Sequence, residues 1–179
     1  MGCGRKKPSI GSLTASEAGL MNNIVIDTNP LAYIYNGVLD LGKKYALLLG
    51  ELARGHILMI PKIVYGELSL IFEDVEELKG FIDNTGIVLG EASADVYITA
   101  ASRWKKYNER RVLMCHRCGA RLDRLTCKKC ASEINIRQHI LSDFIIGAFA
   151  RHTGNRLVTH DKGYFSTYFP ELNIITAPD

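Results

Sequence analysis

The sequence lacks any apolar run near the roughly 18 residues that a membrane-spanning helix requires, so we expect no membrane span in these 179 residues. Residues 1–20 also lack the apolar core of about 7–15 residues that marks a secretory signal, and we expect them to form a flexible leader. Cysteine is absent from most of the chain, because four of the five cysteines fall between residues 115 and 130. Disulfide-rich secreted folds spread their cysteines more widely, so the sequence predicts a reducing compartment, the cytoplasm.

Several catalytic motifs are also missing. No glycine-rich phosphate loop is present, which argues against a nucleotide-dependent kinase or ATPase. No serine nucleophile elbow is present, and the five histidines show no recognisable metal-ligand spacing. The hydrophobic fraction of 47% and the charged fraction of 23% are ordinary for a globular domain, which excludes a largely disordered chain, collagen and a coiled coil.

Positive charge is concentrated in one part of the chain. Residues 103–137 hold eleven lysines and arginines against three acids, a charge of +8, so the rest of the chain carries −5 of the net +3. A basic block on an acidic body indicates an anionic partner, most simply nucleic acid. A solvated helix face is the alternative interpretation, and charge alone does not exclude it.

Apolar periodicity predicts alternating strands and helices. We expect strands at 23–27, 56–60, 86–89, 156–159 and 172–176, and helices at 28–36, 43–54, 61–72, 73–83, 92–110, 139–154 and 162–168. Asn29 and Ser142 are the expected N-caps of two of these helices, and Gly154 is an expected terminator. This alternation predicts an α/β domain with a mostly parallel sheet and helices on both faces. The domain spans residues 21–110 and 134–179, and residues 111–133 form an insertion.

The insertion carries a cysteine pattern, Cys-x2-Cys-x8-Cys-x2-Cys, formed by Cys115, Cys118, Cys127 and Cys130. Two such pairs on a short hairpin can direct four thiolates to one tetrahedral ion, with Zn2+ the first choice and iron the second. Four protein ligands leave no open position, so this zinc is structural. A redox pair or an accidental cluster is the alternative. The basic residues of this zinc ribbon are candidate RNA contacts: Arg117, Arg121, Arg124, Lys128 and Lys129.

Four acidic residues stand out by their placement. Asp27 follows the first predicted strand and Asp161 lies just beyond the strand at 156–159, where ligands bind in parallel α/β sheets. Glu67 and Asp143 lie on predicted helices among apolar neighbours. The ordinary interpretation of any one of these acids alone is a surface residue or a helix cap. Four converging carboxylates would repel one another unless a cation joined them, and their hard oxygens suit Mg2+ or Mn2+. Such ions promote in-line attack of water on a phosphodiester.

Four segments of the sequence resemble the PIN-domain ribonucleases. They are IVIDTNPLAYI (24–34), IPKIVYGEL (60–68), SDFIIGAFARHTGNRLVTHDKGY (142–164) and NIIT (173–176). The resemblance implies a parallel α/β/α sandwich and a metal-dependent endoribonuclease whose acidic quartet is Asp27, Glu67, Asp143 and Asp161. It also implies that Thr28, Asn29 and Thr159 are the polar residues that support these acids.

The insertion separates this chain from the usual members of that family. Small PIN toxins of the VapC type usually lack a cysteine insert, and the PIN nuclease that matures small-subunit rRNA carries its zinc ribbon elsewhere. Three hypotheses follow: an endoribonuclease acting on rRNA or tRNA, in rRNA processing with a ribosomal partner; a VapC-type toxin restrained by a protein inhibitor; and a non-catalytic RNA-binding module. A DNA nuclease is a further alternative, since an acidic metal site does not select the sugar. The resemblance also implies a homodimer as one possible assembly.

Overall fold

The computed structural model describes residues 22–110, 113–114, 121–122, 126–132 and 141–178. The core of the fold is a five-stranded sheet in the order β3-β2-β1-β6-β7. Its strands are β1 (Asn23–Ile26), β2 (Ile57–Pro61), β3 (Val88–Gly90), β6 (Arg156–Val158) and β7 (Asn173–Ile175). Every neighbouring pair in this sheet is parallel. The predicted parallel α/β architecture is therefore confirmed. The leader predicted at 1–20 lies outside the described residues.

Strand β1 forms the centre of the sheet. Its residues Ile24, Val25 and Ile26 are at most 1% exposed, as expected for a strand that is covered on both faces. Val25 pairs with Met59 of β2 on one side and with Leu157 of β6 on the other. Because β6 comes from the far end of the sequence, this pairing places the residues that follow β6 beside those that follow β1.

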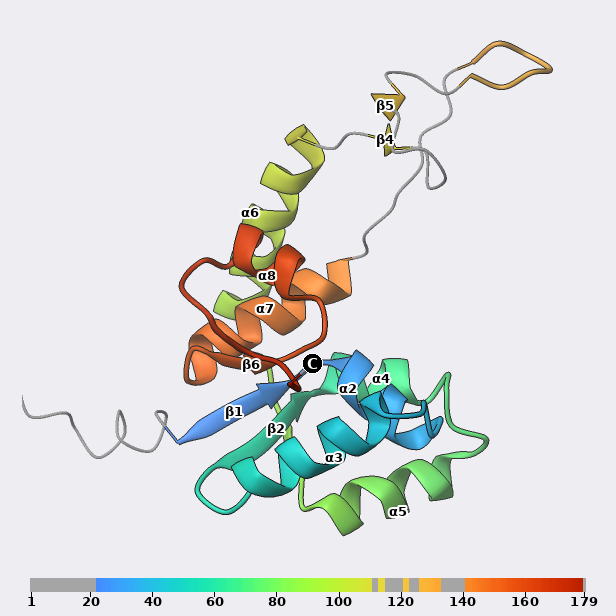
Figure 1. Cartoon of the computed structure of the whole chain (residues 1–179). Helices are drawn as coiled ribbons and strands as arrows, with labels where there is room; N and C mark the ends of the chain where they lie inside the picture. Colours follow the sequence, from blue (N-terminus) through green and yellow to red (C-terminus); the bar gives the residue numbers. More distant parts are fainter. Residues whose placement is uncertain (1–21, 111–112, 115–120, 123–125, 133–140, 179) are drawn as a thin grey trace, which may run out of the picture.

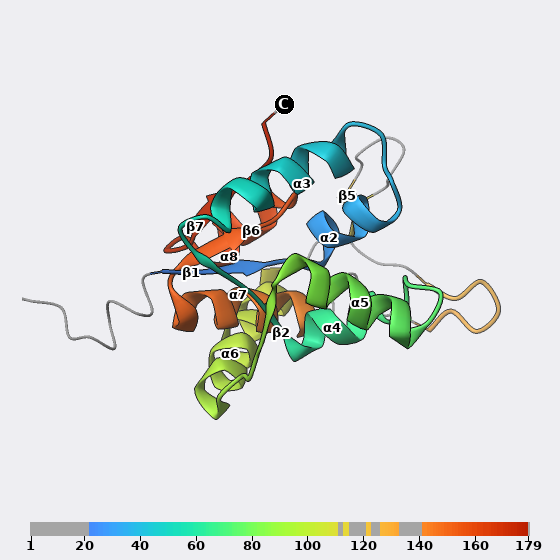
Figure 2. The same cartoon turned by 90° about the horizontal axis from the view of Figure 1, so that it is seen from below.

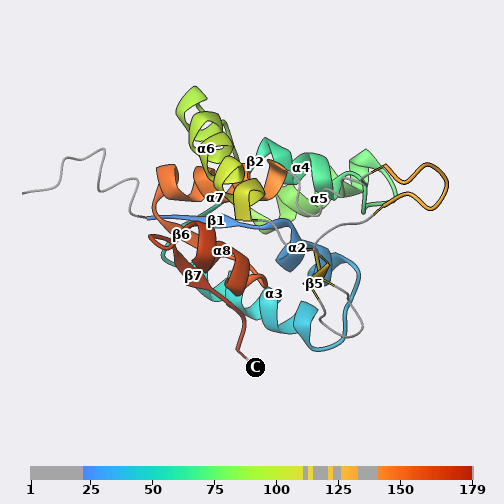
Figure 3. The same ribbon diagram turned by 90° about the horizontal axis from the view of Figure 1, so that it is seen from above.

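Helices cover both faces of the sheet. They are α2 (Thr28–Tyr35), α3 (Leu41–Leu52), α4 (Lys62–Leu68), α5 (Val75–Thr85), α6 (Ala94–Arg110), α7 (Leu141–Thr153) and α8 (Lys162–Tyr168). Helix α3 lies on one side of the sheet, whereas α7 lies on the other and α6 packs outside α7 (Figures 1 and 2). The view from above shows the same three layers with β1 between them (Figure 3). This arrangement is the α/β/α sandwich that the sequence predicted.

Helix α7 lies deep in the fold. Nine of its 13 residues are buried, because it contacts β1 and β6 on one side and α6 on the other. A helix that is apolar nearly all round is the pattern expected for such a position. Its Gly147 allows the ring of Phe169 to approach closely, since a Cβ built on this glycine would lie 2.4 Å from that ring.

Two predicted helix caps are wrong. Asp27, not Asn29, caps α2, because its carboxylate accepts a hydrogen bond from the backbone N–H of Thr28. Ser142 lies inside α7, and its buried hydroxyl has no hydrogen-bond partner among the described residues. The predicted terminator Gly154 directly follows the last residue of α7, and the next residue, Asn155, has a left-handed backbone with φ of 58°.

Between α6 and α7 the structure describes a second, two-stranded sheet. Strands β4 (Leu113–Met114) and β5 (Arg121–Leu122) pair antiparallel, with Leu113 opposite Leu122. Most of the remaining insertion lies outside the described residues, so the domain division at 111–133 stays a prediction. In the described part of the chain, no helix has the length and apolar character that crossing a membrane requires.

Candidate active site

A pocket of about 320 Å³ lies at the carboxyl edge of the sheet, next to the ends of β1 and β6. The four predicted acids Asp27, Glu67, Asp143 and Asp161 all line it. The predicted supporting residues Thr28 and Asn29 line it as well, and Thr159 is hydrogen-bonded to Asp27 directly behind it. The structure therefore brings the whole predicted set into one place.

Each carboxylate comes from a different element. Asp27 follows β1 and caps α2, and Asp161 caps α8, where its Oδ1 accepts from the backbone N–H of Tyr164 at 3.1 Å. Glu67 is the sixth residue of α4, and Asp143 is the third residue of α7. Three of the four acids thus lie at or near the start of a helix, where the unpaired backbone N–H groups favour negative charge.

Asp27 is buried and held by several hydrogen bonds. It is 5% exposed and accepts hydrogen bonds from the backbone of Thr28 at 2.8 Å, from Asn29 Nδ2 at 2.8 Å and from the Thr159 hydroxyl at 2.6 Å. Burial raises the pKa of Asp27 from 3.8 to about 6, and the charges of Asp143 and Glu67 add to this effect. The hydrogen bonds from Thr159 and Thr28 act in the opposite direction.

Two further polar side chains connect the elements around Asp27. The hydroxyl of Thr28 donates a short hydrogen bond to Oε2 of Glu67 and so joins α2 to α4. Asn29 donates to Asp27, while its Oδ1 accepts from the backbone N–H of His160 at 2.9 Å. Asn29 therefore fixes the loop after β6 relative to the loop after β1. Thr28 and Asn29 therefore contact two of the predicted acids, Glu67 and Asp27.

The donor set suits a hard divalent cation. Four carboxylates line the pocket, and the described residues that line it include no lysine, arginine or histidine. Among the described residues, no group of three Asp, Glu, His or Cys side chains has the arrangement to hold a metal ion by itself. Mg2+ commonly binds through one or two carboxylates and keeps several waters, so this pocket fits such an ion without three converging protein ligands.

Half of the predicted zinc site is described. The backbone N–H of Cys127 donates to the Ser132 carbonyl and the N–H of Ala131 donates to the Cys127 carbonyl, each at 2.8 Å. Ala131 has φ of 58°, so residues 127–132 form a tight turn that brings Cys130 back toward Cys127. Hydrogen bonds from Ser132 and from Cys127 lower the pKa of the Cys130 thiol. A lowered thiol pKa favours the thiolate, which is the form that binds metal.

The other predicted residues of the insertion are less fully described. Cys115, Cys118, Arg117 and Arg124 lie outside the described residues, so the four-thiolate zinc site stays a prediction. Arg121 belongs to β5, and Lys128 and Lys129 are exposed beside the cysteine turn.

The sequence analysis missed two aromatic residues of the acidic pocket. Tyr164 and Phe165 of α8 line it. Burial raises the pKa of Tyr164, and the charge of Asp143 contributes, so the phenol keeps its proton across the physiological range. Aromatic residues in a short helix read as core residues in a sequence, and Phe165 is indeed 1% exposed. No sequence signal separated the face of α8 that meets the pocket from the face that meets the core.

Comparisons with known proteins support the fold. No family model and no curated protein matches the sequence. Fifteen chains of solved structures match the structure. One belongs to the crystal structure of VapBC2 from Rickettsia felis bound to a DNA fragment from their promoter, with a TM-score of 0.56 and 17% sequence identity. The match covers 87% of this chain and 99% of that chain. At this identity the likeness establishes a PIN-like α/β/α fold.

Proposed function

We propose that this protein is a metal-dependent endoribonuclease that hydrolyses RNA phosphodiesters at the acidic pocket. The observation that carries the proposal is the meeting of Asp27, Glu67, Asp143 and Asp161, from four elements, in one pocket. A buried carboxylate among like charges is costly to ionise, as the raised pKa of Asp27 indicates. Sites whose carboxylates have such a shifted pKa commonly have a catalytic or metal-binding role.

The residues of the chain have distinct roles in this proposal. Asp27, held by three hydrogen bonds, would provide a fixed oxygen ligand for Mg2+ or Mn2+, and Asp143, Glu67 and Asp161 would complete the charge around it. When bound, the ion would supply an activated water and stabilise the leaving oxygen of the phosphodiester. Thr28 orients Glu67, and Thr159 orients Asp27, so the carboxylates keep their positions before substrate arrives.

RNA affinity must come from outside this pocket, because carboxylates repel phosphates. We propose that the zinc ribbon at 111–133 supplies part of it. The thiolates of Cys115, Cys118, Cys127 and Cys130 would hold one structural Zn2+, and Arg117, Arg121, Arg124, Lys128 and Lys129 would contact the phosphate backbone. The exposure of Lys128 and Lys129 beside the described cysteine turn supports this role.

Cleavage mapping tests the proposed activity. The full chain is incubated with precursor rRNA and with a tRNA pool in Mn2+, and the RNA ends are mapped. We expect discrete cuts that disappear in EDTA and in Asp143→Asn, but persist in Asp83→Asn, a matched change of an exposed acid on α5. Cuts in precursor rRNA would favour a role in rRNA processing. Binding without cleavage would instead favour the non-catalytic RNA-binding module.

The fold likeness to VapBC2 favours a second candidate, a toxin of a toxin–antitoxin pair. In that case the partner is a small protein inhibitor, and the protein can act as a homodimer in the cytoplasm. Expression of the wild-type chain would then arrest growth, and Asp27→Asn would abolish the arrest. Relief of the arrest by co-expression of a neighbouring reading frame would separate this candidate from an rRNA-processing enzyme, whose expression needs no such partner.

A further inference from the structure

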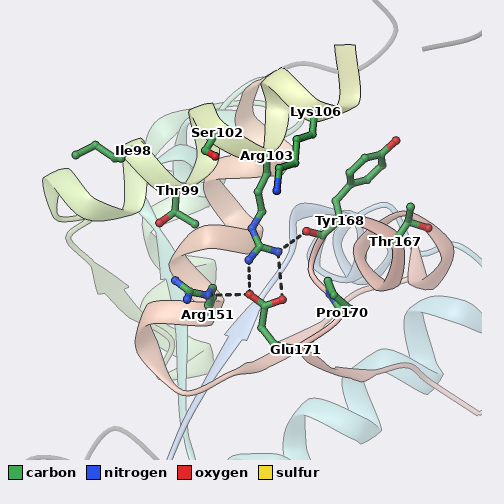
Figure 4. A pocket seen from close by; sticks show the side chains of 10 residues that line it. All are labelled: Ile98, Thr99, Ser102, Arg103, Lys106, Arg151, Thr167, Tyr168, Pro170 and Glu171. Carbon is green, nitrogen blue, oxygen red and sulfur yellow. Dashed lines mark hydrogen bonds and ion pairs between the residues drawn. The ribbon is translucent and has the colours of Figure 1, made fainter. Parts of the chain in front are cut away.

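A second pocket, of about 620 Å³, lies away from the acidic pocket among α6, α7 and the end of α8 (Figure 4). Three cationic side chains line it, Arg103 and Lys106 of α6 and Arg151 of α7, and we call it the basic pocket. Glu171 is its one carboxylate among the lining residues. Arg151 and Glu171 also line an adjoining pocket of about 560 Å³.

Arg103 is built firmly into this site. Its guanidinium donates to both carboxylate oxygens of Glu171, at 2.5 and 3.1 Å, and also to the backbone carbonyl of Tyr168. The same group lies 4.6 Å from the ring centroid of Phe169, which is fully buried. Nε of Arg151 approaches Glu171 Oε1 at 2.8 Å from the other side. The guanidinium groups of Arg103 and Arg151 therefore both contact the Glu171 carboxylate.

Positive charge exceeds what Glu171 neutralises. Lys106 lies one turn beyond Arg103 on the same face of α6, and Figure 4 shows its amine turned toward the Arg103 guanidinium. Lys106 makes no ion pair with any described residue. Two cations that turn toward each other without an intervening anion repel, so the three cations and one carboxylate leave room for a further anionic group. Ser102 lines the same wall and its hydroxyl can donate a neutral hydrogen bond to the anion, whereas the Thr99 hydroxyl lies 3.1 Å from Nε2 of His152.

Helices α7 and α8 each contribute residues to both the basic pocket and the acidic pocket. Asp143 and Arg151 both belong to α7 and lie eight residues apart, which is about 12 Å along a helix axis. On α8, Tyr164 lines the acidic pocket and Tyr168, one turn later, lines the basic pocket. A nucleic acid strand whose scissile phosphate lies at the acidic pocket therefore reaches the basic pocket within a few nucleotides.

From this placement we infer that the pocket formed by Arg103, Lys106 and Arg151 binds a backbone phosphate of the RNA substrate, a few nucleotides from the cleaved bond. This inference rests on the proposed function, because it takes the acidic pocket as the place of cleavage. Arg103 holds the wall of the subsite through Glu171, while Lys106 and Arg151 supply the charge that attracts the phosphate. The subsite is separate from the zinc ribbon and provides affinity that the carboxylates cannot.

Binding measurements on the full chain test the subsite. Fluorescence anisotropy of a labelled single-stranded RNA is recorded in EDTA, where no cleavage is expected, over a range of salt concentrations. Lys106→Gln and Arg151→Gln are each expected to weaken binding roughly tenfold at low salt and to reduce the salt slope by about 0.7. The matched controls Lys43→Gln and Arg54→Gln, exposed on and just after α3 across the sheet, should bind as wild type. Unchanged affinity and slope in Lys106→Gln and Arg151→Gln would overturn the inference.

Glu171→Gln gives a test of opposite sign. The change removes the one negative charge among the lining residues, while Arg103 keeps its hydrogen bond to the Tyr168 carbonyl and its place over the Phe169 ring, so RNA binding should become several-fold tighter. A variant that merely fails to fold cannot produce this result. If a poly-glutamate peptide instead binds with the expected sensitivity to Lys106→Gln while RNA binding has none, the pocket accepts an acidic protein and the RNA subsite is rejected.

The subsite and the nuclease fail in different ways. If Lys106→Gln weakens RNA binding but the wild-type chain cleaves no RNA in Mn2+, the phosphate-binding pocket stands and the nuclease is rejected. If the wild type cleaves RNA and Lys106→Gln and Arg151→Gln bind and cleave equally well, the nuclease stands and the subsite is rejected. Asp27→Asn separates the two functions in one protein, since it should lose cleavage and retain the salt-dependent binding.

Discussion

The hydroxyl of Thr159 donates a 2.6 Å hydrogen bond to Oδ2 of Asp27, and this contact joins the loop after β6 to the loop after β1. The Thr159 hydroxyl oxygen in turn accepts a hydrogen bond from the backbone N–H of Asp161 at 3.1 Å. Thr159 is fully buried, so water cannot replace either bond. One hydroxyl thus positions two of the four carboxylates, and the acidic pocket depends on the parallel pairing of β1 with β6.

Thr159→Val should destabilise the protein and disturb Asp27. The change keeps the shape but removes the hydroxyl, which leaves the Asp161 N–H without its acceptor. We expect a loss of about 1–3 kcal/mol in the free energy of unfolding, measured by urea titration, because buried unsatisfied groups carry that cost. Thr167→Val, which removes an exposed hydroxyl bonded to the Gly163 carbonyl, should change stability by less than about 0.5 kcal/mol. Equal effects of the two changes would show that the Thr159 bond does not matter.

Asp27 should make stability fall as pH rises. Its folded pKa of about 6 exceeds the ordinary 3.8, so between these values the folded state binds more protons than the unfolded state. The stabilisation is fully present below about pH 3.8 and is lost as pH rises through about 6. The difference corresponds to roughly 3 kcal/mol.

Asp27→Asn removes this titration. In EDTA, the free energy of unfolding of Asp27→Asn relative to wild type should therefore rise by roughly 3 kcal/mol between pH 4 and pH 7.5, measured by urea unfolding at a series of pH values. The comparison is a difference between two proteins, so the titrations of groups that do not interact with Asp27 cancel. Parallel pH profiles for the two proteins would mean that Asp27 titrates normally in the folded state.

The position of the acidic pocket was predictable from sequence because it follows from topology. Asp27 and Asp161 come directly after two apolar strands, and the carboxyl ends of parallel strands meet at one edge of a sheet. Glu67 and Asp143 were singled out because their sequence neighbours are apolar, and a carboxylate is rarely buried among apolar residues unless it has a partner. The sequence could not show the hydrogen bond from Thr159 that holds Asp27, because Thr159 follows β6 and lies 132 residues from Asp27 in the chain.

The basic pocket shows the opposite case. Arg103 and Lys106 belong to the basic block that the sequence revealed, but Arg151 and Glu171 come from other elements and carry no motif. Their meeting depends on how α6 packs on α7 and on where the chain turns after α8. Such a cluster of side chains, held by tertiary packing alone, has no periodicity or spacing that a single sequence displays.

Mn2+ should stabilise the folded protein through the acidic pocket. An ion that binds only the folded state adds about 2.7 kcal/mol at a concentration of 100 times its dissociation constant, or roughly 5–10 °C in Tm for a chain of this length. The Tm shift, measured by thermal unfolding with and without Mn2+, should be lost in Asp27→Asn and Asp143→Asn but kept in Asp83→Asn. It should also shrink at pH 5, where protonated Asp27 competes with the ion. A shift that all three variants share would place the ion elsewhere.

Gly147→Ala should destabilise the protein although alanine is the better helix former. A Cβ at this position of α7 would lie 2.4–2.7 Å from three ring atoms of Phe169, a fully buried ring that also packs against the Arg103 guanidinium. Overpacking of this kind costs about 1–3 kcal/mol, which exceeds the gain of roughly 1 kcal/mol in helix propensity. Gly50→Ala on α3 meets no atom within 4 Å and should show the propensity gain alone. Urea unfolding of both variants measures this difference in stability. Displacement of the Phe169 ring should also weaken RNA binding at the basic pocket, because the Arg103 guanidinium packs against that ring. If Gly147→Ala proves as stabilising as Gly50→Ala, α7 and Phe169 do not pack as closely as the structure shows.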